Sequence, residues 1–190
     1  MRKVWKHTFV TFPLAEWSEL PMWCVVHVRD QEEKNTKEFV SNLLPKNLNA
    51  RCFHLTRSRR KKYGGQWHTV QENLFPGYVF IDTDQPEQVY QELKRAPRPR
   101  LLFSDEEYVS ALEQQESDFM GMLADRSGDI GLSTVRVGSD GELSYVSGPL
   151  RMARDKVRKV NLHKRVAEIE ADLMGQRRVL YLGIEIEGAG

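Results

Sequence analysis

Clusters of basic residues are the side chains in this sequence best suited to chemistry, and that chemistry is the binding of phosphate groups. Each Lys or Arg that contacts a phosphate releases counterions, so a local cluster can bind nucleic acid although the net charge of the chain is only +1. The first cluster consists of Arg57, Arg59, Arg60, Lys61 and Lys62, and the second of Lys94, Arg95, Arg98 and Arg100. The third consists of Arg151, Arg154, Lys156, Arg158, Lys159, Lys164 and Arg165. The alternative for each cluster is a solvated loop or strand face.

The third cluster ends in the segment that most favours contact with nucleic acid. Residues 161–165, with the sequence Asn-Leu-His-Lys-Arg, stand between two strand-like runs and are typical of a hairpin tip. At such a tip His163, Lys164 and Arg165 point outward together, and His163 can donate a hydrogen bond or stack on a base.

Metal and enzyme chemistry have weaker support in this sequence. Cys24 with His27, and Cys52 with His54, are close pairs, but no second pair follows at the spacing of a tetrahedral zinc site. No pair of acids and no glycine-rich phosphate loop forms a recognisable catalytic motif. We therefore predict that the protein is not an enzyme and has neither a metal nor a cofactor. The two cysteines are too few for a disulfide framework, which favours a reducing cytoplasm, and each is predicted to be a small buried thiol.

The composition of the 190 residues, 40% hydrophobic and 29% charged, is that of a globular protein with one or two small domains. No window approaches the roughly 20 apolar residues of a membrane span. Residues 1–21 contain charges among their apolar residues and are not typical of a signal peptide. Met22 lies immediately before the first strand-like run, so a translation start at Met22 is left open and residues 1–21 are treated as an extension.

Residues 22–125 are predicted to form a first domain of strands and helices in the order β-α-β-β-α-β, the split βαβ arrangement of ferredoxin-like domains. Asp30 with Glu33 and Asp84 with Glu87 match capping boxes at the starts of two helices, and Pro45 marks the end of the first. The strands are expected at residues 23–28, 52–55, 78–81 and 100–103. A further helix is expected after a third capping box at Ser104 and Glu107.

Residues 126–144 are rich in Gly and Ser and are predicted to be a linker of short irregular turns. Residues 145–187 follow as a second domain. Within it, Ala167, Ile169, Ala171 and Leu173 alternate with acidic residues, and this period of two indicates a half-buried strand. Short strands and turns over this range predict a small β-barrel, so the fold class of the whole chain is α+β.

The segment Phe75-Pro76-Gly77-Tyr78-Val79 joins a turn of restricted geometry directly to an apolar strand. Pro76 fixes its own φ and Gly77 allows a positive φ or a close approach of another backbone. An aromatic strand of this kind is either core or a binding surface. One alternative is an RNA-recognition motif, which has the same element order and an aromatic strand that stacks bases, although Val79 and Pro76 do not match its signature.

Taken together, these segments resemble a bacterial NusG-type transcription factor over residues 22–187. The resemblance rests on residues 23–26 (Trp-Cys-Val-Val), on residues 75–79 and on residues 147–150 (Ser-Gly-Pro-Leu), which are similar to the start of a KOW domain. It implies an N-terminal domain that binds the clamp helices of RNA polymerase and a KOW domain that recruits RNA, a ribosomal protein or Rho. The polymerase-binding surface that it implies consists of Trp23, Phe75, Pro76, Gly77 and Tyr78, and the basic residues 57–62 are expected in a loop that faces DNA.

Departures from the family pattern favour a specialised member. Cys24 replaces a tyrosine, and Asp155 stands where a KOW motif has a central glycine. The basic turn at residues 158–165 is similar to that of LoaP-type antiterminators, whose KOW domain binds an RNA hairpin. We therefore favour an operon-specific antitermination factor, acting as a monomer, over a general NusG factor, and a stand-alone RNA-binding protein with an RRM-like domain is the remaining alternative.

One branch of this family, the RfaH branch, has a terminal domain that switches between helices and a barrel. Residues 164–175 contain good helix formers. The period-two alternation and the following Gly175 nevertheless favour strands there.

Overall fold

The computed structural model describes residues 22–96 and 109–188. The expected extension 1–21, the expected strand 100–103 and the expected capping box at Ser104 and Glu107 lie outside these ranges. The first part of the chain contains β1 (Met22–His27), α1 (Glu33–Leu43), η2 (Lys46–Leu48), β2 (Arg51–Phe53), β3 (Thr56–Tyr63), β4 (Gln66–Asn73), β5 (Tyr78–Thr83), α2 (Pro86–Arg95), β6 (Val109–Ala111) and α3 (Gln114–Leu123). The second part contains β7 (Asp129–Ile130), β8 (Ser133–Val137), β9 (Leu143–Ser147), α4 (Pro149–Met152), η3 (Arg154–Lys156), β10 (Val157–Asn161), β11 (Val166–Leu173) and β12 (Gln176–Ile186).

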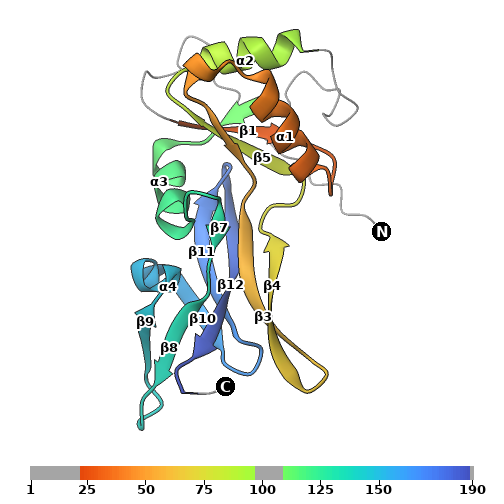
Figure 1. Cartoon of the computed structure of the whole chain (residues 1–190). Coiled ribbons are helices and arrows are strands. Elements are labelled where there is room, and N and C mark those ends of the chain that lie inside the picture. The colour runs from red at the N-terminus through yellow and green to blue at the C-terminus, as the bar shows by residue number, and fades with distance from the viewer. Residues whose placement is uncertain (1–21, 97–108, 189–190) are drawn as a thin grey trace, which may run out of the picture.

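The first sheet has four strands in the order β2-β5-β1-β6, with antiparallel pairing throughout. Helices α1 and α2 cover its upper face in Figure 1. This is the ferredoxin-like arrangement that the sequence predicted, and the α+β fold class is confirmed. The fourth strand is β6, which the sequence pattern had placed inside a helix.

Two of the predicted helix starts are wrong by a few residues. Gln31 has a positive φ of 71°, so the chain turns after Asp30 and α1 begins only at Glu33. Pro86 stands in the first turn of α2, where its fixed φ suits the helix, and Asp84 lies outside it. A capping box does occur at α3, where the side chains of Glu113 and Glu116 bond each other's backbone N–H groups.

The basic residues 57–62 lie on a strand, not in the loop that we expected. β3 pairs antiparallel with β4 from Thr56 opposite Asn73 to Tyr63 opposite Gln66, and β4 itself was not predicted. Gly64 and Gly65 form the turn, with φ of 58° and 80°. The hairpin projects below the first sheet and runs beside β12 (Figure 1).

The second part of the chain forms a five-stranded sheet in the order β10-β11-β12-β8-β9. This strand-rich region fits the small β-barrel predicted for the C-terminal residues, and β11 is the strand that the alternation indicated. Residues 126–144 are not an irregular linker, because they include β7, β8 and the start of β9. Ile130 and Val135 are fully buried, so these strands are held by core packing. The many Gly and Ser residues of this range led to the prediction of a linker.

The two faces of the first sheet belong to different cores. Cys24, Val26 and Ile81 face α1 and α2 in one apolar cluster. On the opposite face Trp23, Phe53 and Phe80 belong to a second cluster, which continues into α3 and into the terminal sheet. The residues that the terminal sheet and its adjoining segments contribute include Leu150, Ala167, Ile169, Ala171, Leu173, Met174, Leu180, Leu182 and Ile184. The terminal sheet therefore packs against the first part of the chain through a shared core.

Candidate nucleic-acid interface and aromatic face

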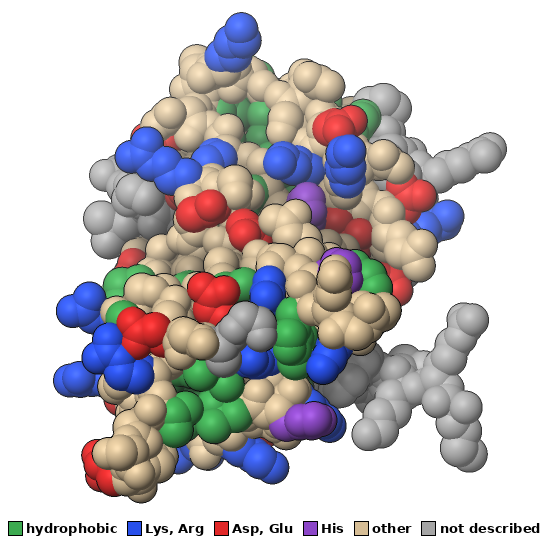
Figure 2. Space-filling view, turned by 60° about the horizontal axis from the view of Figure 1, so that its bottom comes forward, with side chains coloured by type: hydrophobic (Ala, Val, Ile, Leu, Met, Phe, Trp, Pro, Cys, Tyr) green, Lys and Arg blue, Asp and Glu red, His purple; other side chains and the backbone are tan. Residues whose placement is uncertain are grey.

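The structure brings the first and third basic clusters together around one groove of about 820 Å³. One wall comes from the β3–β4 hairpin and the other from the turn between β10 and β11. The lining residues are Arg59, Arg60, Lys61, Lys62, Trp67, Leu162, His163, Lys164 and Arg165. Figure 2 views the molecule from below and shows Lys and Arg side chains spread among apolar side chains on this end.

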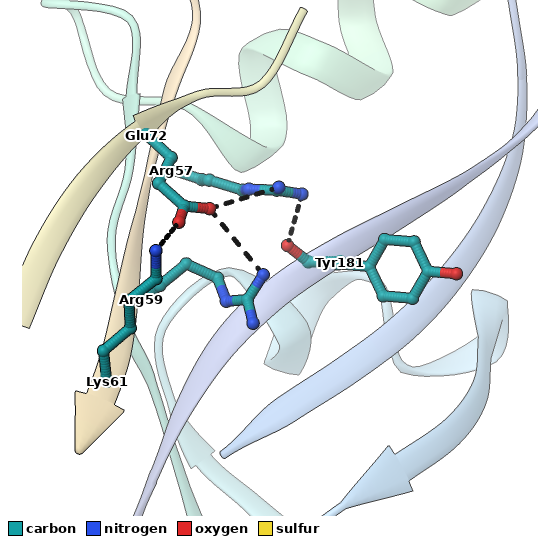
Figure 3. Close-up of polar contacts among 5 residues, drawn as sticks. All are labelled: Arg57, Arg59, Lys61, Glu72 and Tyr181. Atoms are coloured by element: carbon teal, nitrogen blue, oxygen red, sulfur yellow. Dashed lines mark hydrogen bonds and ion pairs between the residues drawn. The ribbon is translucent and has the colours of Figure 1, made fainter. Parts of the chain in front are cut away.

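Glu72 forms ion pairs with three of the five cations of the first cluster (Figure 3). In the β3–β4 register it lies opposite Arg57, so by the alternation of strands it shares a face with Arg59 and Lys61. Its carboxylate is 2.6 Å from Lys61 Nζ, 3.3 Å from Arg57 Nη2 and 3.7 Å from Arg59 Nη1. The Lys61 hydrogen bond is the main reason that the pKa of Glu72 lies below its ordinary value.

Arg57 acts as a structural link and not as a free cation. Its Nη1 donates a 2.9 Å hydrogen bond to the Tyr181 carbonyl on β12, while Nη2 reaches Glu72 (Figure 3). Arg57 therefore joins the hairpin to the terminal sheet, and it does not line the groove.

The turn between β10 and β11 presents its basic residues through a defined local structure. The backbone N–H of Lys164 donates to Asn161 Oδ1 at 2.8 Å, and that of Arg165 donates to the Leu162 carbonyl at 3.3 Å. Arg165 has a φ of 54°, an unfavourable value for a residue with a side chain, and Ile184 N–H donates to its carbonyl at 3.0 Å. The expected hairpin tip is thus present, with His163 and Lys164 exposed.

The remaining basic residues named in the sequence analysis do not line the groove. Arg158 pairs with Glu170 at 2.7 Å, and Lys156 Nζ lies 5.4 Å from the centroid of the Phe119 ring. Arg154 lies with Lys156 in η3, and Lys159 is an exposed residue of β10. Lys94 and Arg95 belong to α2, on the other side of the first sheet, and Arg98 and Arg100 lie outside the described residues.

Trp67 is a groove residue that the sequence analysis did not identify. It lies opposite Lys62 in the hairpin register and its side chain is half-buried. Lys62 Nζ is 6.0 Å and Arg165 Cζ 5.2 Å from its ring centroid, both within the range of cation–π contacts. The signal available in the sequence was a tryptophan a few residues beyond a basic run, separated from it by a Gly-Gly turn.

The aromatic residues expected to form an exposed polymerase-binding surface are buried. Trp23 is 8% exposed, and Phe75 and Tyr78 are each 6% exposed. Gly77 is buried too, and of the predicted set Pro76 alone is exposed. The Trp23 ring meets the Phe53 ring edge-on, with 4.8 Å between centroids. In this structure these residues belong to the core shared with the terminal sheet.

The segment around the β11–β12 turn covers this aromatic face. Arg178 Cζ lies 5.9 Å from the centroid of the Phe75 ring. Burial raises the pKa of Tyr78, and the nearby positive charge of Arg178 offsets part of the rise. Gly175 N–H donates to Glu116 Oε1 on α3 at 3.4 Å. The segment around the β11–β12 turn therefore contacts both the Phe75 turn and α3.

The turn at Pro76 and Gly77 is held from the other side by α1. Gly77 has a φ of 83°, and its N–H donates to the buried carboxylate of Glu33 at 2.7 Å. A Cβ on Gly77 would also lie 3.2 Å from the Val28 carbonyl oxygen. The positive φ expected of this glycine is confirmed.

Cys24 and Cys52 are buried free thiols, as predicted. Burial raises the pKa of each thiol to about 12. Among the residues that the structure describes, no three His, Cys, Asp or Glu side chains gather closely enough to hold a metal ion. Within the same ranges, no helix combines the length and the apolar character needed to cross a membrane.

Comparison with known protein families gives evidence that is independent of the structure. The family model described as "Transcription termination factor nusG" matches residues 21–119, which is more than half of the chain. No curated protein matches the chain significantly. The matched range contains the first sheet, the β3–β4 hairpin and the aromatic turn. The chain therefore belongs to the NusG family, whose members act in transcription elongation and termination.

Proposed function

We propose that this protein is an operon-specific transcription antitermination factor. It binds RNA polymerase through its N-terminal domain, residues 22–125, and nucleic acid through the basic surface of a KOW-like domain near its C-terminus. The observation that supports the nucleic-acid part is the β10–β11 turn of that domain, where His163 and Lys164 are exposed beside Arg165. Family membership supports the role in transcription.

Polymerase binding in this proposal uses the face formed by Trp23, Phe75 and Tyr78. An aromatic surface of this kind loses water against a partner and contributes most of its binding free energy there. Because Arg178 of β12 lies over Phe75 and near Tyr78 in this structure, the polymerase clamp helices and the terminal sheet compete for this part of the face. The apparent affinity for polymerase is then reduced in proportion to the fraction of molecules in which the face is open.

The factor acts by binding free energy and not by bond chemistry. Bridging the two sides of the polymerase clamp disfavours the opened, paused state of the enzyme. The terminal domain stays tethered to the elongation complex, which raises the local concentration of the RNA or protein that it holds. An operon-specific factor suppresses pausing only where a specific RNA or DNA element is present. A general NusG factor does not depend on such an element.

Gly183 provides a direct test of polymerase binding through the covered face. A Cβ at Gly183 would lie 2.2 Å from the Ser58 carbonyl oxygen and 3.0 Å from Arg59 Cα, so a side chain there forces β12 away from β3. Gly131→Ala is the matched control, because a Cβ on Gly131 meets no heavy atom within 4 Å. In pull-downs of core RNA polymerase, Gly183→Ala is expected to retain more polymerase than the wild-type protein, and Gly131→Ala the same amount.

Absence of polymerase binding by all three proteins, each shown to be folded by circular dichroism, would exclude the polymerase-binding role. Operon specificity is tested separately by transcription in vitro through a terminator. One template carries the leader of a candidate target operon and the other an unrelated leader. Read-through restricted to the first template is the expected result, whereas equal effects on both templates indicate a general elongation factor.

A further inference from the structure

The groove between the hairpin and the β10–β11 turn has an uneven distribution of charge. Arg59 and Lys61 lie near the Glu72 carboxylate, which offsets part of their charge. Lys62, Lys164 and Arg165 make no ion pair with an acidic side chain of the described residues. The unneutralised positive charge is therefore concentrated around Trp67 and the β10–β11 turn.

Trp67 supplies an aromatic surface in the middle of these cations. The Arg165 guanidinium and the Lys62 ammonium group both lie near its ring, at 5.2 Å and 6.0 Å from the centroid. Nucleic-acid bases stack on tryptophan rings and on the planes of arginine guanidinium groups. Lys62 and Lys164 line the same groove as Trp67 and are available to contact the phosphates of a bound strand.

The groove exists only while the terminal sheet is packed on the hairpin. Lys62 and Trp67 belong to the β3–β4 hairpin, and Lys164 and Arg165 belong to the β10–β11 turn of the terminal sheet. The Arg57–Tyr181 hydrogen bond and the close approach of Gly183 to Ser58 hold the two walls at this separation. A ligand that contacts both walls consequently favours the packed arrangement.

We infer that this composite groove binds single-stranded nucleic acid, with one base stacked on the Trp67–Arg165 pair and the flanking phosphates on Lys62 and Lys164. Duplexes fit the chemistry less well, because their bases are already stacked and paired and offer no free face to Trp67. The site differs from binding of an RNA hairpin by the terminal domain alone, since half of it belongs to the β3–β4 hairpin. The inference rests on the nucleic-acid part of the proposed function and does not need polymerase binding.

The test is a fluorescence-anisotropy titration of the full chain with labelled oligonucleotides about 12 nucleotides long, within the range of sites on single-strand-binding proteins. Oligo(U) and oligo(dT) distinguish RNA from DNA, and an RNA hairpin of similar size represents the duplex. Trp67→Ala is expected to weaken single-strand binding on the order of tenfold, and Trp67→Phe, which keeps an aromatic ring, is expected to restore most of it. Circular dichroism checks that each variant is folded.

A second pair of variants tests the phosphate contacts. Lys62→Ala with Lys164→Ala is expected to reduce the slope of log K against log salt concentration by about 1.4, since each lost phosphate contact on a single strand contributes about 0.7. Lys34→Ala with Lys46→Ala removes the same charge from exposed positions on α1 and η2 and is expected to leave the slope unchanged.

Each outcome has a defined meaning. Preferential binding of either single strand, with loss in Trp67→Ala and in the groove double variant, supports the inference. Tighter binding of the RNA hairpin with no effect of Trp67→Ala overturns it, while the proposed role of the terminal domain in binding RNA stands. Equal losses in the groove and control double variants also overturn it, because binding then depends on net charge alone.

Discussion

The Cζ atom of Arg178 lies 5.9 Å from the centroid of the Phe75 ring, so a residue of β12 covers the turn that begins β5. Arg178 also donates through Nε to the Leu173 carbonyl at 3.1 Å, which fixes the direction of its side chain. A contact between one cation and one ring therefore spans the boundary between the first sheet and the terminal sheet.

Arg178→Ala is expected to open the aromatic face and to raise the apparent affinity for polymerase. Loss of a cation–π contact of about 1 kcal/mol would increase the open fraction about fivefold if the packed state dominates. The measurement is a polymerase titration by biolayer interferometry. Arg177→Ala is the control, because Arg177 is exposed and pairs with Glu170 within the terminal sheet. Equal affinities for both variants and the wild type would show that the Arg178–Phe75 contact does not limit the access of polymerase to the aromatic face.

Glu33→Ala is expected to lower the free energy of unfolding by about 1–3 kcal/mol, because the Gly77 N–H would be left buried without its acceptor. Glu33→Gln keeps an acceptor oxygen and is expected to lower the free energy of unfolding by less than Glu33→Ala does. Urea unfolding followed by circular dichroism measures both. Glu38→Ala, an exposed change on the same helix, is the control. A loss as large for Glu38→Ala as for Glu33→Ala contradicts the role given to Glu33.

Glu72 is expected to make the stability of the protein depend on pH in the acid range. Its pKa is lower in the folded state than its ordinary value of 4.5, mainly through the Lys61 hydrogen bond. A depressed carboxyl pKa contributes stability that is present above the unfolded pKa and is lost as the pH falls through the folded pKa. Unfolding free energies measured between about pH 7 and about pH 3 should therefore fall less steeply in Glu72→Gln than in the wild type. Glu142→Gln, at an exposed position, should retain the wild-type slope.

Cys24 and Cys52 are expected to react slowly with iodoacetamide in the folded protein. With a pKa of about 12, only a very small fraction of each thiol is ionised at about pH 8, and the thiolate is the nucleophile. Mass spectrometry should find both thiols unmodified under native conditions and both alkylated in denaturant. Rapid native labelling of either one would show that the cluster beneath α1 and α2 opens readily.

Single-stranded oligonucleotide is expected to weaken polymerase binding by the full chain. The oligonucleotide favours the arrangement in which Phe75 and Tyr78 are covered, and linkage requires that polymerase weaken oligonucleotide binding by the same factor. The measurement is a polymerase titration with and without saturating oligo(U). Lys62→Ala with Lys164→Ala should weaken the effect while the affinity for polymerase alone is kept, because the Lys62–Trp67 contact lies within the hairpin and Lys164 is exposed. Stronger polymerase binding in the presence of oligonucleotide would contradict competition between the two states.

Strands with apolar periodicity could be predicted from the sequence, and charged strands could not. β1 consists mostly of apolar residues, and β11 alternates apolar with polar residues. Both strands pack on a core, so the sequence pattern predicted them. β3 carries five cations between Arg57 and Lys62 and resembles a loop by composition. It forms a strand by pairing with β4, where Glu72 contacts three of those cations across the hairpin, and a cross-strand pairing of this kind has no local signature.

Residue types and local spacing by themselves determined the turn at Pro76 and Gly77, the α+β class and the location of the basic clusters. Each depends on backbone conformations or periodicities contained within a few neighbouring residues. Tertiary structure alone decided that Lys62 and Lys164 share a groove, that the Trp67 ring lies near both Lys62 and Arg165, and that Trp23, Phe75 and Tyr78 are buried. These relationships arise when the terminal sheet packs on the first sheet and removes apolar surface from water, and they join residues far apart in the chain.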